Sequence, residues 1–231
     1  MALGSRGGTT AEHLDRFYRP QAASYDRFRD RLLHGRAELL DRLPFLGAQT
    51  WVDFGGGTAF LLEQAGARLA ALSSVVVVDL SEALLDVART RAARHGWTNV
   101  RLVCGDVLTV DLPVGQADLV TFSYSLTMMP EWFAALDRAW RVLRPGGTIG
   151  VVDFFVSATH PPAGQVRHRS ITRAAWPLWF GRDGVHLTPD HLRYLRWRFE
   201  TCCLLERRGP LPFVPLARPP YYLFVGRRSD V

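Results

Sequence analysis

Apolar and polar positions follow two different periods along this chain. Short continuous apolar runs, such as Val75–Val78, are typical of strands that are covered on both faces. Between these runs apolar residues recur at helical spacing, and Ser81 stands where a helix N-cap is expected. The pattern predicts strands at Thr50–Phe54, Val75–Leu80, Val100–Cys104, Ala117–Tyr124, Thr148–Phe155, Cys202–Arg207 and Tyr221–Gly226, and helices at Phe60–Ala71, Ser81–His95 and Glu131–Leu143.

Alternating strands and helices predict an α/β fold with a Rossmann-like, doubly wound, seven-stranded sheet and right-handed crossovers. The Arg-Pro-Gly-Gly segment at residues 144–147 is a stop signal for the helix before it. No long helix separates the last two strands, so we expect an antiparallel C-terminal hairpin at one edge of the sheet.

The remaining segments divide the chain into a tail (residues 1–13) and one domain (14–231). Within the domain, residues 14–46 are expected to form an N-terminal helical lid. Residues 157–199, rich in Trp, His, Arg and Pro, interrupt the sheet after the fifth strand. Ligands of open α/β sheets bind beyond the carboxyl ends of the strands, so this insertion is expected to lie above the site and shape the substrate pocket.

Composition supports a globular protein with a basic surface. The 231 residues are 48% hydrophobic and carry a formal charge of +6, mostly from arginine. Such a surface attracts anions, which favours an anionic membrane face, although a merely solvated arginine-rich surface has equal weight. Without an apolar run long enough to span a bilayer or act as a signal peptide, we expect a cytoplasmic protein, peripheral on the inner membrane face. Cys104, Cys202 and Cys203 lack metal or disulfide spacing, so no metal site is predicted and they are interpreted as buried small residues.

A glycine-rich turn after the first strand carries the strongest functional signal. Gly55 and Gly57 let the backbone approach a ligand closely because they have no Cβ. Asp79, followed by Leu80, ends the next strand at the spacing where a carboxylate accepts the hydroxyls of a nucleotide ribose. Asp53 precedes the turn and adds a second acid. These residues predict a cofactor that carries a nucleoside.

The details of the turn favour S-adenosylmethionine over a dinucleotide. Phe60 occupies the place of the third glycine in the dinucleotide pattern. The carboxylate of Asp53 suits a ligand with an ammonium group and repels a phosphate. The chain also lacks the phosphate-binding loop of nucleoside triphosphatases.

Three later segments end strands of the expected sheet and add candidate site residues. Gly105, Asp106 and Val107 follow the third strand. There the carboxylate of Asp106 can accept a hydrogen bond from the exocyclic amine of adenine, and the side chain of Val107 can stack on the adenine ring. The alternative for Asp106 is a structural role in the turn. Ser123 and Tyr124 follow the fourth strand, between cofactor and acceptor. For Asp153, contact with the acceptor and a structural role are equally supported.

The order of these motifs resembles class I S-adenosylmethionine-dependent methyltransferases over residues 14–226. More narrowly, the chain resembles the N-methyltransferase of betaine-lipid synthesis. The motifs that carry this narrower resemblance are Phe17-Tyr18 with Gln21, Tyr25-Asp26 with Arg29, Leu33 with Gly35-Arg36, the segment from Phe122 to Pro130, Trp179-Phe180 with Leu187 and Pro189, and Pro220 to Tyr222.

The resemblance implies that the chain methylates the amine of diacylglyceryl-homoserine three times, giving the trimethyl betaine lipid. It implies a lipid head-group substrate, no nucleic-acid partner, and a separate aminocarboxypropyl transferase upstream, whose module we do not find in this sequence. Alternatives are a methyltransferase for phosphatidylethanolamine or for a soluble amine or phenol. A non-catalytic S-adenosylmethionine-binding regulator is an alternative of a different class.

Further roles around the acceptor follow from the resemblance and from side-chain chemistry. The resemblance implies that Tyr25 closes over the methionine end of the cofactor. For Arg36, pairing with a carboxylate of either the cofactor or the head group and an exposed helix arginine are equally supported. Aromatic faces of Tyr25, Tyr124 and Trp179 stabilise the cationic product. His186 is the best candidate base by its ordinary pKa, although a structural histidine is the commoner case. Arg29 and Tyr222 complete the expected substrate-binding set.

Overall fold

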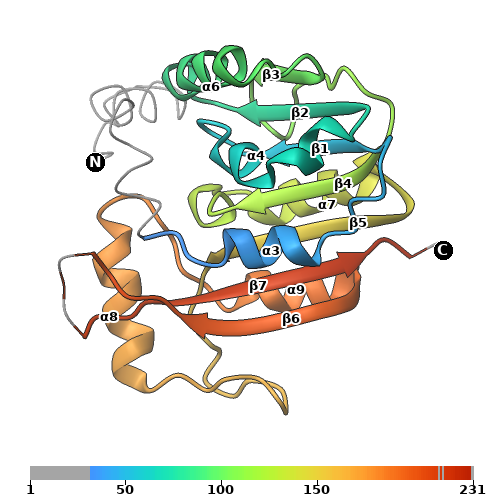
Figure 1. The fold of residues 1–231 in the computed structure, drawn as a ribbon. Coiled ribbons are helices and arrows are strands. Elements are labelled where there is room, and N and C mark those ends of the chain that lie inside the picture. Colours follow the sequence, from blue (N-terminus) through green and yellow to red (C-terminus); the bar gives the residue numbers. More distant parts are fainter. Residues whose placement is uncertain (1–31, 213, 215, 230–231) are drawn as a thin grey trace, which may run out of the picture.

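Seven strands form one twisted sheet with helices on both faces (Figure 1). The computed structural model describes residues 32–212, 214 and 216–229. The expected tail and residues 14–31 of the expected lid lie outside this part. The strands are β1 Thr50–Phe54, β2 Ser74–Asp79, β3 Val100–Cys104, β4 Ala117–Ser123, β5 Leu143–Phe154, β6 Glu200–Arg208 and β7 Pro220–Arg227. The helices are α3 Arg36–Arg42, α4 Phe60–Ala65, α5 Ala67–Ala70, α6 Glu82–His95, the 3₁₀ helix η1 Leu126–Met128, α7 Trp132–Val142, α8 Ser170–Gly181 and α9 Asp190–Arg198.

The strand order is β3-β2-β1-β4-β5-β7-β6, which confirms the predicted fold class. β1 to β5 pair in parallel, whereas β7 is antiparallel to both β5 and β6. The C-terminal hairpin is therefore present, with β6 at the edge and β7 inside the sheet. The order reverses between β1 and β4, and such a switch point is where open α/β sheets bind ligands.

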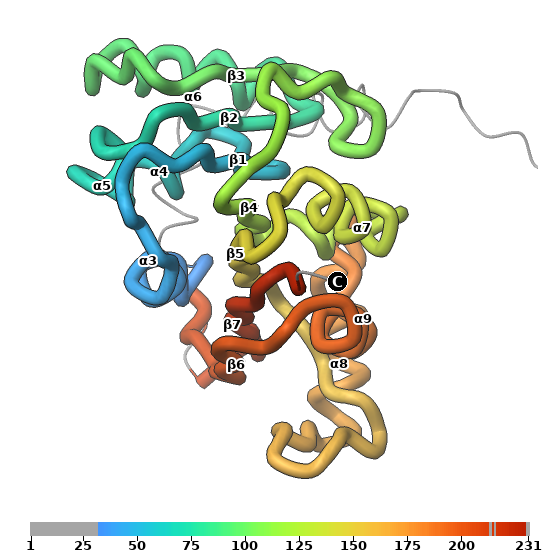
Figure 2. The backbone as a smooth tube through the Cα atoms, turned by 90° about the vertical axis from the view of Figure 1, so that its right-hand side faces the viewer, coloured from blue at the N-terminus to red at the C-terminus, as the bar shows by residue number. Residues whose placement is uncertain are grey.

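Alternate side chains of the strands supply two hydrophobic cores, one on each face. In β2, Val75 and Val77 enter the core under α3, α4 and α6, whereas Val76 and Val78 enter the core under α7 and α9. Figure 2 shows α3 on one side of the sheet and α7 and α9 on the other. The uninterrupted valine run therefore reflects a strand that is buried on both faces.

Several element boundaries differ from the prediction for local reasons. The helix expected at Phe60–Ala71 is two helices, because Gly66 at φ 58° and ψ −131° breaks it. The helix before the Arg-Pro-Gly-Gly segment ends at Val142, but β5 already begins at Leu143 and contains that segment. The predicted cap is confirmed, since the Leu84 backbone N–H donates to Oγ of Ser81.

The lid and the insertion, the two segments expected to surround the site, also pack against the sheet. The described part of the lid contains α3. Leu39 of this helix and Leu43, directly after it, pack against β5 so closely that a Cβ at Gly150 would lie 2.9 Å from Leu43. Within residues 157–199, α9 covers the sheet, because Leu192 and Leu195 belong to the same core as α7. Only the part before α9, including α8, lies outside the doubly wound layers. Among the described residues no helix is both long and apolar enough to cross a bilayer.

The cysteine interpretation is wrong for two of three residues. Cys104 and Cys202 are exposed and Cys203 is half-buried, and all three are free thiols. Cys104 ends strand β3, which lies at the edge of the sheet, and Cys202 is in the other edge strand, β6. Edge strands have one flank without a neighbouring strand, a feature that the sequence pattern does not reveal.

Candidate active site

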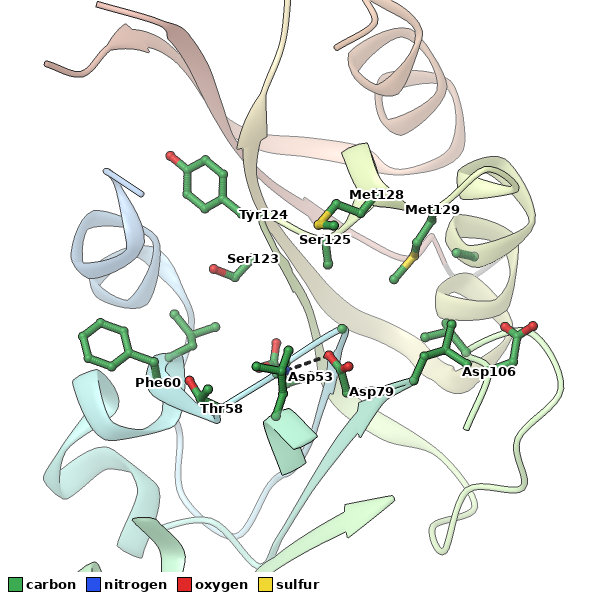
Figure 3. A pocket seen from close by; sticks show the side chains of 18 of the residues that line it. Asp53, Thr58, Phe60, Asp79, Asp106, Ser123, Tyr124, Ser125, Met128 and Met129 are labelled. Atoms are coloured by element: carbon green, nitrogen blue, oxygen red, sulfur yellow. Dashed lines mark hydrogen bonds between the residues drawn. The ribbon is translucent and has the colours of Figure 1, made fainter. Parts of the chain in front are cut away.

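A cavity of about 420 Å³ opens at the carboxyl ends of β1, β2 and β4, at the switch point of the sheet. Figure 3 shows Phe60 and Tyr124 at one end of this cavity and Asp106 at the other, with Asp53 and Asp79 between them. Its volume is within the range of about 300–1,000 Å³ that is common for small-molecule sites. The lining residues are Arg36, Asp53, Gly55 to Thr58, Phe60, Leu61, Asp79, Leu80, Leu84, Asp106 to Leu108, Ser123 to Ser125, Met128 to Glu131, and Ala135.

Asp53 is fully buried at the floor of the cavity. Its Oδ1 accepts a 2.5 Å hydrogen bond from Oγ1 of Thr121, which in turn accepts from the indole N–H of Trp51. Its Oδ2 is buried and has no hydrogen-bond partner among the described residues. Burial raises the pKa of Asp53 from 3.8 to about 7, although Thr121 and the charge of Arg36 oppose this shift. The site therefore contains a buried acceptor that a ligand donor would satisfy.

The glycine turn fits tightly between Asp53 and the neighbouring strand. Gly55 and Gly57 have φ angles of 67° and 54°, a region that favours glycine. A Cβ on Gly56 would lie 2.6 Å from Oδ2 of Asp53 and 2.7 Å from Val77. A Cβ on Gly55 would meet Ser125 at 2.5 Å. The turn thus presents bare backbone to the cavity, as the sequence predicts.

Asp79 ends β2 and holds the turn in place. The backbone N–H of Gly57 donates to its Oδ2 at 2.8 Å, the dashed line in Figure 3, and the N–H of Ser81 donates to Oδ1 at 2.9 Å. Burial raises the pKa of Asp79, and these backbone hydrogen bonds lower it. Each oxygen keeps a second lone pair for a hydroxyl donor. Asp79 therefore combines the predicted ligand role with a structural role in the turn.

The segment after β3 lines the far end of the cavity. Asp106 is exposed, and its Oδ1 accepts the backbone N–H of Leu108 at 2.9 Å. The turn interpretation of Asp106 is therefore correct, and the residue also lines the cavity together with Val107. Gly105 is not a lining residue; a Cβ there would lie 2.8 Å from Val110, so this glycine permits the close packing of the turn.

Arg36 reaches the cavity from α3 and stacks against two aromatic rings. Its Nε donates to Oγ of Ser123 at 2.9 Å. Its guanidinium lies 5.6 Å from the ring centre of Phe60 and 5.7 Å from that of Tyr124, distances typical of cation–π contacts. Arg36 is the one basic residue among the described lining residues, which also include four acids (Asp53, Asp79, Asp106 and Glu131).

Tyr124 lies in an unusual backbone conformation at the end of β4. Its φ of 57° is uncommon for a residue with a side chain, and such conformations concentrate at functional sites. Its hydroxyl donates to the carbonyl of His34 at 2.6 Å, and burial raises its pKa well above 10. At neutral pH the phenol therefore stays protonated. The ring, rather than a phenolate, is what Tyr124 can offer to a cation.

Asp153 is fully buried beneath the loop that follows β4. Its Oδ1 accepts Oγ1–H of Thr127 at 2.7 Å and the N–H of Phe154, and its Oδ2 accepts the N–H of Thr127. Burial raises its pKa to about 7 against these hydrogen bonds. Asp153 does not line the cavity. Of the two expected roles, the geometry supports the structural one: Asp153 anchors η1, next to the lining residue Met128.

The remaining candidates from the sequence either lie away from the cavity or fall outside the described residues. Tyr25 and Arg29 lie outside the described residues. Tyr222 is fully buried in β7 against Phe155, and Trp179 is exposed on α8; neither lines the cavity. His186 is exposed, and its backbone N–H donates to the carbonyl of Thr127 at 2.7 Å. Its role as a base stays a prediction.

Sequence reasoning did not assign several residues that form the cavity. Met128 and Met129 receive no role from the sequence, and both line the cavity. Phe60, noted only as a departure from the dinucleotide pattern, has the guanidinium groups of Arg36 and Arg91 at 5.6 Å and 5.4 Å from its ring centre. The signal for the methionines is their place directly after β4, at the switch point. Within the part of the chain that the structure describes, no cluster of His, Cys, Asp or Glu is arranged to bind a metal.

Residues 52–147 match a protein family described as a methyltransferase domain, and this segment contains every lining residue of the cavity except Arg36. The arrangement of sheet and site is that of class I S-adenosylmethionine-dependent methyltransferases, and S-adenosylmethionine is the cofactor of this class. The predicted cofactor is thereby confirmed, whereas the betaine-lipid resemblance stays a prediction.

Curated relatives of the chain are named for ubiquinone and menaquinone biosynthesis. The chain is 26% identical over 148 residues to the ubiquinone/menaquinone biosynthesis C-methyltransferase UbiE of Hahella chejuensis, covering 62% of this chain and 59% of the relative. It is 32% identical over 146 residues to UbiE of Idiomarina loihiensis, covering 60% and 58%. The chain thus spans less than two thirds of the length of these relatives.

Solved structures share the fold of the chain at low sequence identity. The N-methyltransferase NodS from Bradyrhizobium japonicum WM9, in complex with S-adenosyl-L-homocysteine, has a TM-score of 0.69 and 16% identity, covering 96% of this chain and 100% of NodS. The 4+2 cyclase SpnF has a TM-score of 0.71 and 16% identity, covering 99% of both chains. Because SpnF is named a cyclase, the fold by itself does not specify the reaction.

The residues of the cavity fit S-adenosylmethionine. The orphaned Oδ2 of Asp53 suits an ammonium donor, and the open lone pairs of Asp79 suit ribose hydroxyls. Arg36 can pair with a carboxylate. The turn at residues 55–57 leaves no room for side chains, which keeps its backbone open to the cofactor.

Proposed function

We propose that this chain is an S-adenosylmethionine-dependent N-methyltransferase that converts the amine of diacylglyceryl-homoserine to the trimethyl betaine lipid. The observation that carries the proposal is the charge pattern of the cavity: four acids and one arginine among its described lining residues. The methionine end of the cofactor and a homoserine head group are both zwitterions. A cavity that presents separate acidic and basic groups suits both ligands when they are bound together.

When bound, S-adenosylmethionine supplies an electrophilic methyl group, so the chain must mainly position the acceptor in line with it. The acceptor nitrogen must be unprotonated to react. Positive charge remains on nitrogen after transfer, and each aromatic face can stabilise it by about 0.5–2 kcal/mol. Tyr124 supplies such a face at the cavity wall. His186 is proposed as the base, because its backbone hydrogen bond to Thr127 places its residue next to η1, whose Met128 lines the cavity.

A second candidate is C-methylation of a quinone-type ring that carries a lipid tail. The observation that favours it is the likeness to the two UbiE enzymes. A ring carbon ortho to a hydroxyl reacts best when that hydroxyl is ionised, so this reaction also needs proton removal. Both candidates share a lipid-borne acceptor and differ in the atom that receives the methyl group.

Product analysis distinguishes these functions. The purified chain is incubated with methyl-labelled S-adenosylmethionine and a lipid mixture that contains diacylglyceryl-homoserine, phosphatidylethanolamine and a demethylated menaquinol. We expect label in the trimethylated homoserine lipid, and none with the Asp79→Ala variant. Label in the quinone supports the second candidate, and label in phosphatidylcholine species supports the phosphatidylethanolamine alternative. Cofactor binding without label in any lipid or added soluble amine indicates a regulator and overturns the proposal.

A further inference from the structure

Helix α8 carries an apolar face that is exposed to solvent. Ile171 and Leu178 are each 72% exposed and Trp179 is 55% exposed, with Ala174 and Ala175 exposed between them. These positions recur at the spacing of one helix face. Single exposed apolar residues are ordinary on protein surfaces, but a contiguous apolar face marks an interaction site.

The opposite face of α8 is fixed to the wall of the cavity by aromatic contacts. The ring of Phe180 stacks on that of Phe154 at 4.6 Å, and Phe154 meets the ring of Tyr124 at 4.7 Å. Trp176 packs against Phe180 at 5.9 Å. Figure 1 shows α8 at the end of the sheet toward which β2 and β4 point, which is the end where the cavity opens. The exposed face is therefore part of the same end of the molecule as the site.

The charges around this face are mostly positive. Residues 166–183 contain four arginines and one acid, the exposed Asp183. Arg167 and Arg169 are exposed before the helix, and Arg182 is exposed at its end. The buried His168 contributes no charge at neutral pH, because burial lowers its pKa to about 4. An apolar helix face with tryptophan, flanked by arginine at both ends, has the composition of interfacial helices that lie on anionic bilayers.

We propose that α8 docks the protein onto an anionic lipid bilayer, with Ile171, Leu178 and Trp179 in the interface and the flanking arginines against lipid phosphates. This inference rests on the proposed function, because an enzyme that methylates a lipid head group must reach the bilayer surface. The aromatic contacts from Phe180 to Tyr124 then hold the cavity close to the lipid head groups. Pairing of two copies through this face is disfavoured, because residues 166–183 carry a net positive charge and a symmetric pair brings two such segments together.

Vesicle sedimentation tests the docking. The full chain is mixed with vesicles of phosphatidylcholine and phosphatidylglycerol, which contain no methyl acceptor, and with vesicles of phosphatidylcholine alone. We expect binding to the anionic vesicles that weakens by about tenfold or more in the double variant Ile171→Glu with Leu178→Glu. Removing Arg169 or Arg182 by substitution with Gln should weaken binding about fivefold each. The matched control is the double variant Leu46→Glu with Trp197→Glu. These residues are 79% and 73% exposed, in the loop before β1 and on α9, and the variant should bind like the wild type.

Three outcomes overturn the docking: equal binding of the α8 double variant and the wild type, equal loss in the control variant, or no preference for anionic vesicles. A dimer of the wild type in sedimentation velocity that the α8 variant loses would assign the face to self-association instead. Methyl transfer to a short-chain, water-soluble acceptor separates this inference from the proposed function. The α8 variant should keep that activity. If the wild type binds vesicles but methylates none of the acceptors, docking is supported and the proposed function is refuted.

Discussion

Replacing Asp53 by asparagine should change how the stability of the protein depends on pH. Asp53 is fully buried, one of its oxygens has no partner among the described residues, and its pKa is raised from 3.8 to about 7. One pKa unit corresponds to about 1.4 kcal/mol, so ionising Asp53 costs the folded protein about 4 kcal/mol. Asparagine has nearly the same shape and never ionises.

The sign follows from proton binding. Between pH 4 and 7 the unfolded chain has already released the proton of Asp53 while the folded protein keeps it, so the stability contributed by this proton is lost as pH rises through that window. Asp153 has a pKa raised to about 7 for the same reason and adds a similar loss. Relative to Asp53→Asn, the free energy of unfolding of the wild type should therefore fall by up to about 1.4 kcal/mol for each pH unit in that window, because all other titrating groups are common to both proteins.

Urea denaturation at intervals from pH 5 to pH 8 measures this difference. At pH 8 the Asp53→Asn variant should be more stable than the wild type by about 1–3 kcal/mol, since the lost ionisation cost is partly offset by an imperfectly paired amide. Asp111→Asn, a substitution of an exposed carboxylate, serves as the control and should reproduce the wild-type curve. Parallel curves for wild type and Asp53→Asn across the whole range would refute the reasoning.

Three further substitutions test the contacts around the cavity. Gly56→Ala should cost about 1–3 kcal/mol in urea denaturation, because its Cβ would lie 2.6 Å from Asp53, whereas Gly115→Ala, which has open space, should be nearly neutral; equal effects would contradict this packing. Thr127→Val removes a hydrogen bond to buried Asp153 and should lower the free energy of unfolding by about 1–3 kcal/mol, so an unchanged denaturation midpoint would speak against it. Tyr124→Phe deletes the hydroxyl bond to the His34 carbonyl and should lower thermal stability by about 0.5–1.5 kcal/mol; a variant as stable as the wild type would argue against that bond.

The central sheet and its acids were predictable because their signals are local. The valine run of β2 is buried on both faces, as its composition indicates, and the glycine turn and Asp79 lie where strand and helix spacing places them. The break at Gly66 was missed because an isolated glycine is tolerated in many helices. Its backbone angles here allow no continuation.

The rest of the site depends on contacts between distant segments. Arg36 meets Ser123 across 87 positions of sequence, and the left-handed backbone of Tyr124 has no sequence signature. Asp153 ends a strand beside the site, yet it turns into the core because Thr127 and the start of the β4 loop supply its hydrogen bonds. The sequence pattern therefore indicates which residues stand at strand ends, whereas packing decides which of them face the cavity.

The most direct test of the account is calorimetric titration of S-adenosylhomocysteine into the wild type and into Asp79→Ala. The account predicts binding to the wild type and an affinity lower by about 1–3 kcal/mol, roughly 5- to 150-fold, in the variant, because charged hydrogen bonds to the ribose are lost. Since Asp79 also holds Gly57, circular dichroism must first show that the variant is folded. Equal affinity in a folded variant would contradict the assignment of this cavity to the cofactor.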